Sequence, residues 1–186
     1  MSSPEHFPLM IVNASSIKGE GKALEVRSPY DDHLIATVAT ANASALEAAL
    51  SHAHRLFARR ACWIPVYERI VILERLTGLL KEQAENLALG AALEGGKPLI
   101  DSRIEMTRCI DSIRICIDTL RSDAPCPPLM GLNAASKNRV ALMQREPIGV
   151  VAAVSAFNHP LNLIAHQVGP AFAAGCPVIV KPAADT

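Results

Sequence analysis

The sequence has no excess of charge of either sign, and this balance argues against partners that bind through a strong net charge. Eighteen Lys and Arg residues are matched by eighteen Asp and Glu residues, so the formal net charge is zero. Without a net field there is no general attraction to nucleic acid or to an anionic membrane, and we expect neither as a partner. Apolar runs are interrupted well before the roughly 18 residues of a membrane span. The first residues lack the basic and apolar regions of a signal peptide, so no such leader is expected.

Cysteine pairs typical of disulfide frameworks or zinc sites are also missing. The five cysteines are an odd number, and no two of them form a Cys-x-x-Cys motif. We therefore expect free thiols in a reducing compartment, provisionally the cytoplasm. The six histidines are scattered, so a metal site is not expected. The sequence also has no Gly-x-Gly-x-x-Gly turn, P-loop, His-Glu-x-x-His motif or nucleophile elbow.

What is present is the composition of a folded globular protein. Half of the residues are apolar and 19% are charged, which argues against disorder as the main state. Near the start, residues 9–13, 24–27 and 33–38 are predicted to be short strands of a small antiparallel sheet, preceded by a loose tail over residues 1–8.

The middle of the chain predicts helices with buried apolar stripes. Ser44 and Glu47 have the spacing of a capping box at the start of the first helix. Pro65 suits the first turn of the second helix, and the helical run continues to about Leu93, where Gly95-Gly96 is expected to stop it. The last helix has apolar residues at a spacing of three to four, which favours core packing over a cofactor groove. Those residues are Met106, Ile110, Ile113, Ile117 and Leu120.

Two features follow the helices. Residues 139–145 alternate in character, which predicts a strand that forms half of a hairpin with the loop before it. Two β-branched runs, residues 150–154 and 178–180, then flank a segment long enough for one crossover helix, which predicts a buried parallel βαβ unit.

Polar residues lie just beyond the carboxyl end of each of these runs, where open α/β sheets bind ligands. Asn158 is either a helix cap or turn residue, or an amide donor to developing negative charge on an oxygen. Lys181 is either a solvated charge or a contact to ribose or phosphate. His159 and His166 lie near the same edge, where a structural or solvated role is favoured although histidine can also act as an acid or base. Cys176, before Pro177 and a strand, is expected to be buried and inert.

These stretches, in their order and spacing, resemble the aldehyde dehydrogenase superfamily over nearly the whole chain from about Leu9. The matching stretches are Ser28-Pro-Tyr, Glu68-Arg69, Glu94-Gly-Gly-Lys97-Pro98, Glu105, Arg145-Glu-Pro-Ile-Gly-Val-Val, Phe157-Asn158-His-Pro and the run from Gly169 to Lys181-Pro-Ala. The resemblance implies an α/β fold with an N-terminal helical layer and the incomplete start of a Rossmann-like parallel sheet. Residues 1–128 would be the first part of the cofactor-binding domain, 129–147 the projecting oligomerisation strands, and 148–186 the first βαβ unit of the dinucleotide-binding sheet.

The same resemblance implies oxidation of a small aldehyde to a carboxylic acid with NAD or NADP, through a cysteine thioester. Asn158 matches the asparagine that stabilises the oxyanion, and Lys181 matches the lysine that contacts the adenine ribose. The other residues implied to lie at the cofactor are Ser155, Ala156, Phe157, Pro182, Ala183 and Ala184. A homodimer or homotetramer is the implied assembly of the intact protein.

Two departures from the family pattern limit these expectations. The family's nucleophilic cysteine, its general-base glutamate and its Gly-rich turn would all lie beyond Thr186, and none of the five cysteines matches the nucleophile. We therefore expect the 186 residues alone to be inactive. A CoA-acylating enzyme and an inactive fragment that serves only as a binding module remain alternatives.

The second departure is Ala184, at a position where many NAD-using members carry a glutamate. Loss of that carboxylate removes repulsion toward a 2′-phosphate, so NADP should be tolerated. The Phe-Asn-His-Pro-Leu-Asn variant that begins at Phe157 resembles branches that act on small polar aldehydes such as lactaldehyde.

Overall fold

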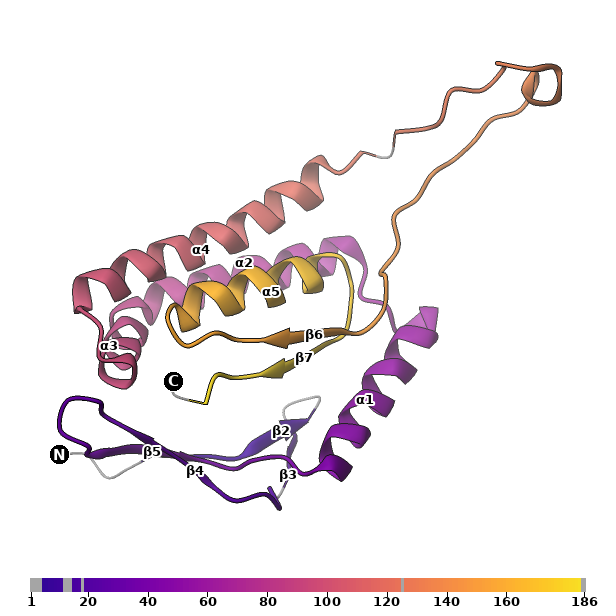
Figure 1. Ribbon diagram of the computed structural model, residues 1–186. Coiled ribbons are helices and arrows are strands. Elements are labelled where there is room, and N and C mark those ends of the chain that lie inside the picture. The colour runs from indigo at the N-terminus through magenta and orange to yellow at the C-terminus, as the bar shows by residue number, and fades with distance from the viewer. Residues whose placement is uncertain (1–4, 12–14, 18, 125, 185–186) are drawn as a thin grey trace.

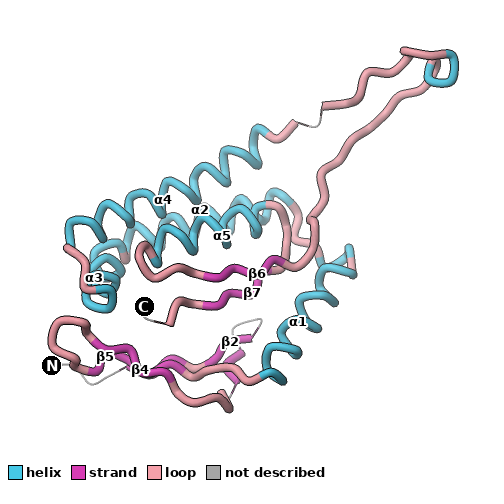
Figure 2. Tube along the Cα trace, in the orientation of Figure 1, coloured by secondary structure: helices cyan, strands magenta, loops and turns pink. Residues whose placement is uncertain are grey.

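The computed structural model describes residues 5–11, 15–17, 19–124 and 126–184. A layer of helices lies against a short parallel pair of strands, and two further sheets formed by the start of the chain lie below that pair in Figures 1 and 2. In chain order the elements are β1 (Glu5–Phe7), β2 (Leu9–Ile11), β3 (Ser15–Ile17), β4 (Leu24–Arg27), β5 (Leu34–Val38), α1 (Ala43–Ala58), η1 (Arg60–Cys62), α2 (Val66–Glu82), α3 (Ala84–Gly95), α4 (Leu99–Ser122), η2 (Ala134–Ser136), β6 (Val151–Val154), α5 (Pro160–Ala173) and β7 (Val178–Lys181).

The strands at the start of the chain form two small sheets. One has the order β1-β5-β4, in which β1 runs parallel to β5 and β4 runs antiparallel to it. The other is the antiparallel pair β2 and β3. The predicted loose tail is therefore wrong over Glu5–Phe7, because β5 supplies a ladder partner that lies far away in the sequence. The predicted strand at 9–13 is confirmed for Leu9–Ile11, and residues 1–4 and 12–13 lie outside the described part of the chain.

The start of α1 corrects the predicted capping box. Asn42 is the N-cap, and its Oδ1 accepts a hydrogen bond of 2.8 Å from the backbone N–H of Ala45. Ser44 already lies within the first turn, so the Ser44–Glu47 box is not formed. Asparagine and serine are about equally good caps, and the first of the two along the chain takes the position here.

The start of α2 and the end of α3 lie close to the residues predicted for them. Pro65 is the N-cap of α2, one position before the predicted place in the first turn. Gly96 closes α3 in the left-handed conformation, with φ of 64°. A Cβ atom at Gly96 would lie 2.6 Å from Cγ of Pro29, so both the backbone angle and the close approach require glycine here.

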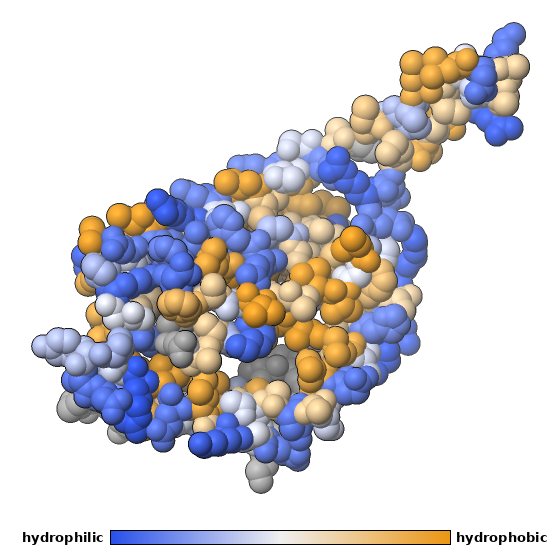
Figure 3. All heavy atoms as spheres, in the orientation of Figure 1, coloured by the Kyte–Doolittle hydropathy of each residue, from blue (hydrophilic) through white to orange (hydrophobic). Residues whose placement is uncertain are grey.

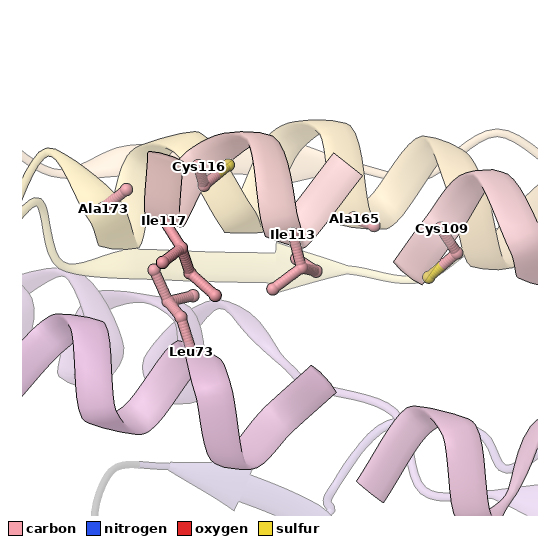
Figure 4. Packing of buried hydrophobic residues seen from close by; sticks show 7 residues of the cluster. All are labelled: Leu73, Cys109, Ile113, Cys116, Ile117, Ala165 and Ala173. Carbon is pink, nitrogen blue, oxygen red and sulfur yellow. The ribbon is translucent and has the colours of Figure 1, made fainter. Parts of the chain in front are cut away.

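The main hydrophobic core lies between α2, α4 and α5 (Figure 4). Its buried members are Leu73, Cys109, Ile113, Cys116, Ile117, Ala165 and Ala173. The stripe predicted on the last long helix is confirmed in Met106, Ile113 and Ile117, each at most 5% exposed. α4 and α5 approach closely at Gly169, where an added Cβ would meet Cδ1 of Ile113 at 2.9 Å. Small residues on α5 thus let the two helices pack tightly.

The segment between α4 and β6 projects away from the rest of the molecule as a long arm (Figure 1). The strand predicted over residues 139–145 is wrong for the chain as described, because no described residue pairs with it along a ladder. Val140 and Leu142 are 87% and 94% exposed, and Figure 3 shows apolar residues gathered near the tip of the arm. An alternating sequence forms a stable strand only beside a partner strand.

The predicted βαβ unit is confirmed. β6 and β7 pair in parallel, with Val151 opposite Val178 and Val154 opposite Lys181, and α5 is the crossover helix that packs on both strands. In the part of the chain that the structure describes, no helix has both the length and the apolar character to cross a membrane.

The burial of Leu73 at the centre of this core yields a stability prediction. Leu73 is 1% exposed, so Leu73→Ala should lower the free energy of unfolding by about 2–5 kcal/mol through lost burial and a new cavity. Leu79→Ala on the same helix is the matched control, because Leu79 is 49% exposed and should cost about 1 kcal/mol or less. Urea unfolding followed by circular dichroism measures both; equal losses would contradict the core assignment.

Candidate active site

The carboxyl ends of β6 and β7 form one edge, and the residues predicted to contact the cofactor or the oxyanion lie along it, whereas His166 lies within α5 with its Nε2 2.9 Å from Ser112 Oγ of α4. The backbone N–H of Ser155, directly after β6, donates a 3.0 Å hydrogen bond to the carbonyl of Lys181, the last residue of β7. This bond ties the two segments together beyond the strands. The side chains of Ala156, Phe157, Asn158 and Lys181 are all exposed at this edge. Pro182 to Ala184 continue from β7 without an acidic side chain.

Asn158 lies between β6 and α5 and does not cap the helix. The N-cap position is His159, and no side-chain cap bond comes from that residue. The side-chain amide of Asn158 is exposed and forms no hydrogen bond with any residue that the structure describes. The cap-residue alternative for Asn158 is therefore not what the structure shows, and its amide is available to an external acceptor.

Glu105 of α4 performs the capping of α5 instead. Its Oε1 accepts hydrogen bonds from the backbone N–H groups of Leu161 and Asn162, at 2.7 and 2.9 Å. These N–H groups belong to the first turn of α5, where the helix itself offers no acceptors. Glu105 is only 1% exposed. A carboxylate at a helix N-terminus is favoured both by these hydrogen bonds and by the helix dipole.

The second oxygen of Glu105 is paired with Lys97, whose side chain is 15% exposed. The ammonium of Lys97 also lies 3.4 Å from the backbone carbonyl oxygen of Asn158. His159 Nδ1 lies 3.6 Å from the same carboxylate oxygen, Oε2. A buried carboxylate without such partners would be costly, so the cluster is electrostatically satisfied.

Sequence reasoning identified Lys97 and Glu105 only as pieces of a resemblance and gave them no role. A signal was present for Glu105, since it falls on the buried face of α4 together with Ser102, Met106 and Cys109. A carboxylate in a buried helical stripe is rare unless it is paired. Its partner could not be read from periodicity, because the N-terminus of α5 lies more than fifty residues later.

A pocket of about 310 Å³ opens beside Asn158, between α4 and the start of α5. It is lined by Lys97, Asp101, Ile104, Glu105, Arg108, Asn158, His159 and Asn162. Ile104 is the one aliphatic side chain in this lining. The pocket is thus suited to a small polar molecule, with the amide of Asn158 at its wall.

Arg69 of α2 lies at the opposite end of α5. Its Nη1 donates to the backbone carbonyl of Ala173, the last residue of the helix. Burial lowers the pKa of Arg69, yet a guanidinium remains charged at neutral pH because its ordinary value lies above 12. A cation at a helix C-terminus is favoured by the dipole. α5 therefore has a buried carboxylate at one end and a guanidinium at the other.

The cysteines offer no activated thiol at this edge among the described residues. Cys109 is next to Glu105 on the buried face of α4, and burial first, then the charge of Glu105, raises its pKa to about 11. Burial also raises the pKa of Cys116. Cys176 is 6% exposed, which confirms its predicted burial. Cys62 and Cys126 are exposed and lie on η1 and at the base of the arm. Within the described ranges no cluster of His, Cys, Asp and Glu could hold a metal ion.

Comparisons with known proteins agree on one family. The sequence model of the Aldehyde dehydrogenase family matches residues 16–186. Succinate-semialdehyde dehydrogenase, mitochondrial, of Oryza sativa subsp. japonica is 32% identical over 171 residues, which cover 90% of this chain and 31% of that protein. Aminoacetaldehyde dehydrogenase of Pseudomonas aeruginosa is 34% identical over 169 residues, or 89% of this chain and 33% of that protein.

Solved structures agree on the same fold. Aldehyde dehydrogenase 21 from Physcomitrella patens, in complex with the reaction product succinate, superposes with a TM-score of 0.87 at 30% identity over 100% of this chain and 38% of that one. Glyceraldehyde-3-phosphate dehydrogenase GapN from Methanocaldococcus jannaschii, complexed with NADP, gives a TM-score of 0.79 at 26% identity over 89% of this chain and 35% of that one. The chain thus spans about a third of the length of these relatives.

Proposed function

This chain belongs to the aldehyde dehydrogenase family, and from that premise we propose that it forms the N-terminal part of an enzyme that oxidises an aldehyde to a carboxylic acid with NAD or NADP. The observation that carries the proposal is the free amide of Asn158 at the shared edge of β6 and β7, with a polar pocket beside it. Because the relatives are about three times as long, the chain acts in this proposal within a longer polypeptide.

The role of Asn158 follows from the charge that develops in aldehyde oxidation. A cysteine thiolate adds to the carbonyl carbon, and the carbonyl oxygen gains a negative charge. Preorganised donors aimed at that oxygen stabilise it more than they stabilise the neutral aldehyde. The side-chain N–H of Asn158 is such a donor. The high pKa of Cys109 makes it unsuitable as the nucleophile, which we place in the part of the enzyme that the relatives have in addition.

The edge formed by Ser155 to Phe157 and Lys181 to Ala184 suits a dinucleotide. Lys181 extends an exposed ammonium at the end of β7, where it can donate to ribose hydroxyl or phosphate oxygens. Phe157 is 62% exposed and offers an apolar surface at the end of β6. NAD or NADP, when bound, supplies the hydride acceptor. The residues of this chain bind and orient it, while Asn158 faces the oxygen that becomes charged.

The pocket beside Asn158 indicates the kind of aldehyde. Its lining holds two amides, a histidine and four charged side chains. An apolar chain would leave the free amide of Asn158 without a hydrogen-bond partner and would remove water from the exposed Asp101 and Arg108, which costs free energy, whereas a hydroxylated or charged aldehyde would satisfy these groups. We therefore propose a short polar substrate, of which lactaldehyde is a suitable test compound.

Asn158→Ala should lower kcat on the order of 10²–10³-fold, because one oxyanion donor is lost. The Kd for the cofactor should stay unchanged, since the substitution leaves Lys181 in place. Lactaldehyde oxidation by the complete gene product measures the first, and fluorescence titration of the cofactor the second. Asn86→Ala is the matched control, because its exposed amide on α3 bonds only the nearby Gln83 among the described residues. Near-normal turnover by Asn158→Ala would overturn the proposal.

Ala184→Glu tests the proposed tolerance for NADP. A carboxylate introduced here would repel a 2′-phosphate, so kcat/KM should fall about tenfold or more for NADP and far less for NAD. Ala184→Gln introduces a neutral side chain of the same size and should leave the ratio of the two values close to that of the wild type. Loss of both activities to the same extent in Ala184→Glu would contradict the idea.

The arm over residues 129–147 is proposed to join subunits into a homodimer or homotetramer. Its alternating apolar side chains have no partner strand within the described residues, and a second copy would supply one. Leu142→Asp should therefore reduce the molar mass of the complete gene product measured by light scattering. Asn138→Asp adds the same charge at an exposed position outside the alternating run and should leave the mass unchanged. A monomeric wild type would refute this assembly.

A further inference from the structure

The start of α5 depends for its hydrogen bonds on a residue of another helix. Pro160 has no N–H, and the next two N–H groups, of Leu161 and Asn162, both donate to Glu105 Oε1. Most helices obtain such a cap from a residue adjacent in the sequence. Here the acceptor comes from the second turn of α4, so the position of the α5 N-terminus is set relative to α4. Asn158 lies three residues before Leu161 and is placed by the same contact.

Lys97 adds a second restraint on the same loop. Its ammonium pairs with Glu105 Oε2 and lies 3.4 Å from the carbonyl oxygen of Asn158. Lys97 itself has little freedom, because it follows the left-handed Gly96 and precedes Pro98, the N-cap of α4. Two opposite charges thus connect the α3–α4 corner, the second turn of α4 and the backbone that directly follows the Asn158 side chain.

Capping of α5 explains the buried carboxylate of Glu105, whereas stability alone does not explain why a largely buried ammonium is paired with it. Apolar residues of similar volume are often as stabilising as a buried ion pair, because both charges lose their hydration. What charged groups add is a fixed geometry for the atoms that they contact. An oxyanion donor requires such a geometry, since its productive position is defined to about 0.5 Å and an error of about 1 Å can cost on the order of 10²-fold in rate.

We propose that the buried Lys97–Glu105 pair positions Asn158 for oxyanion stabilisation, and that it acts on turnover through Asn158 without touching the substrate oxygen. The proposal rests on the proposed function of Asn158. Glu105 holds the N–H groups of Leu161 and Asn162, Lys97 holds the carbonyl of Asn158, and the Asn158 side-chain amide, just before these contacts, remains free to donate. Both are positioning residues for that amide.

A double-mutant cycle between Glu105 and Asn158 in the complete gene product tests this. Glu105→Gln keeps an oxygen for the N–H groups of α5 but loses the charge that pairs with Lys97. It should lower kcat about tenfold or more, with kcat/KM falling by the same factor and the cofactor Kd unchanged. In an Asn158→Ala background, Glu105→Gln should lower kcat by less than about threefold, because the side-chain amide that Glu105 positions is absent. Rates are normalised to folded enzyme.

Two further variants keep the result interpretable. Glu85→Gln is the matched control, since Glu85 pairs with Arg103 of the same α4 helix but at the surface, and turnover should stay normal. Lys97→Met leaves Glu105 on the α5 N–H groups and removes the contact with the Asn158 carbonyl, so kcat per folded enzyme should again fall, and the unpaired carboxylate of Glu105 should also lower the stability. Equal losses for Glu105→Gln in both backgrounds, or no loss in either, would overturn the proposal.

Hydrogen–deuterium exchange separates this proposal from that for the whole enzyme. The amides of Leu161 and Asn162 should exchange faster in Glu105→Leu, which removes the acceptor oxygen, than in the wild type or in Glu85→Gln, whether or not a substrate has been found. Slow exchange in Glu105→Leu would refute the positioning contact itself. If the wild type oxidises no aldehyde with either cofactor, the proposed function fails even where the exchange result supports the contact.

Discussion

The arrangement of the site depends on how α5 is held at its two ends. Glu105 brings a carboxylate to the N-terminus, and Arg69 brings a guanidinium to the carbonyl of Ala173 at the C-terminus. Each charge faces the end of the helix dipole that it stabilises, and each also satisfies backbone groups that a helix leaves without partners. The two residues come from different helices, α4 and α2. Electrostatics therefore fixes where the crossover helix lies along its axis, while apolar packing, with its close contact at Gly169, fixes its distance from α4.

The positions of the parallel strands β6 and β7 depend on α5. β6 leads into α5 through the Asn158 loop, and β7 follows it through Gly175, whose φ of 86° turns the chain back. Gly175 lies close to Arg69, since a Cβ added at Gly175 would be 3.1 Å from Nη1 of Arg69. The same guanidinium thus borders the turn into β7 and the end of α5. Ser155 and Lys181 therefore meet at one edge, where both strands end beside α5. Charged side chains hold this helix at each of its ends.

Features that depend on neighbours in the sequence were predictable, and features that depend on distant partners were not. The βαβ unit, the stripe on α4 and the end of α3 at Gly96 follow from local periodicity and backbone freedom, and the structure confirms them. The strand at Glu5–Phe7 needs β5 as a partner, so its sequence alone gave no signal. The strand predicted at 139–145 fails for the converse reason, because an alternating pattern is present and no described residue pairs with it. The site shows the same division: Asn158 was identified from its place after a buried run, whereas the role of Glu105 required contact with residues of α5.

That contact also excludes the helix-cap alternative for Asn158, and the oxyanion role stays a proposal. An asparagine at the start of a helix ordinarily accepts hydrogen bonds from the first N–H groups with its side-chain oxygen, as Asn42 does at the start of α1. At α5 the acceptor is the carboxylate of Glu105, and the N-cap residue is His159. The side-chain amide of Asn158 is therefore not used to cap α5. A helix capped from a distance leaves the side chain of its own flanking residue free, and on this contact rests the proposal that the buried carboxylate and the exposed amide act together.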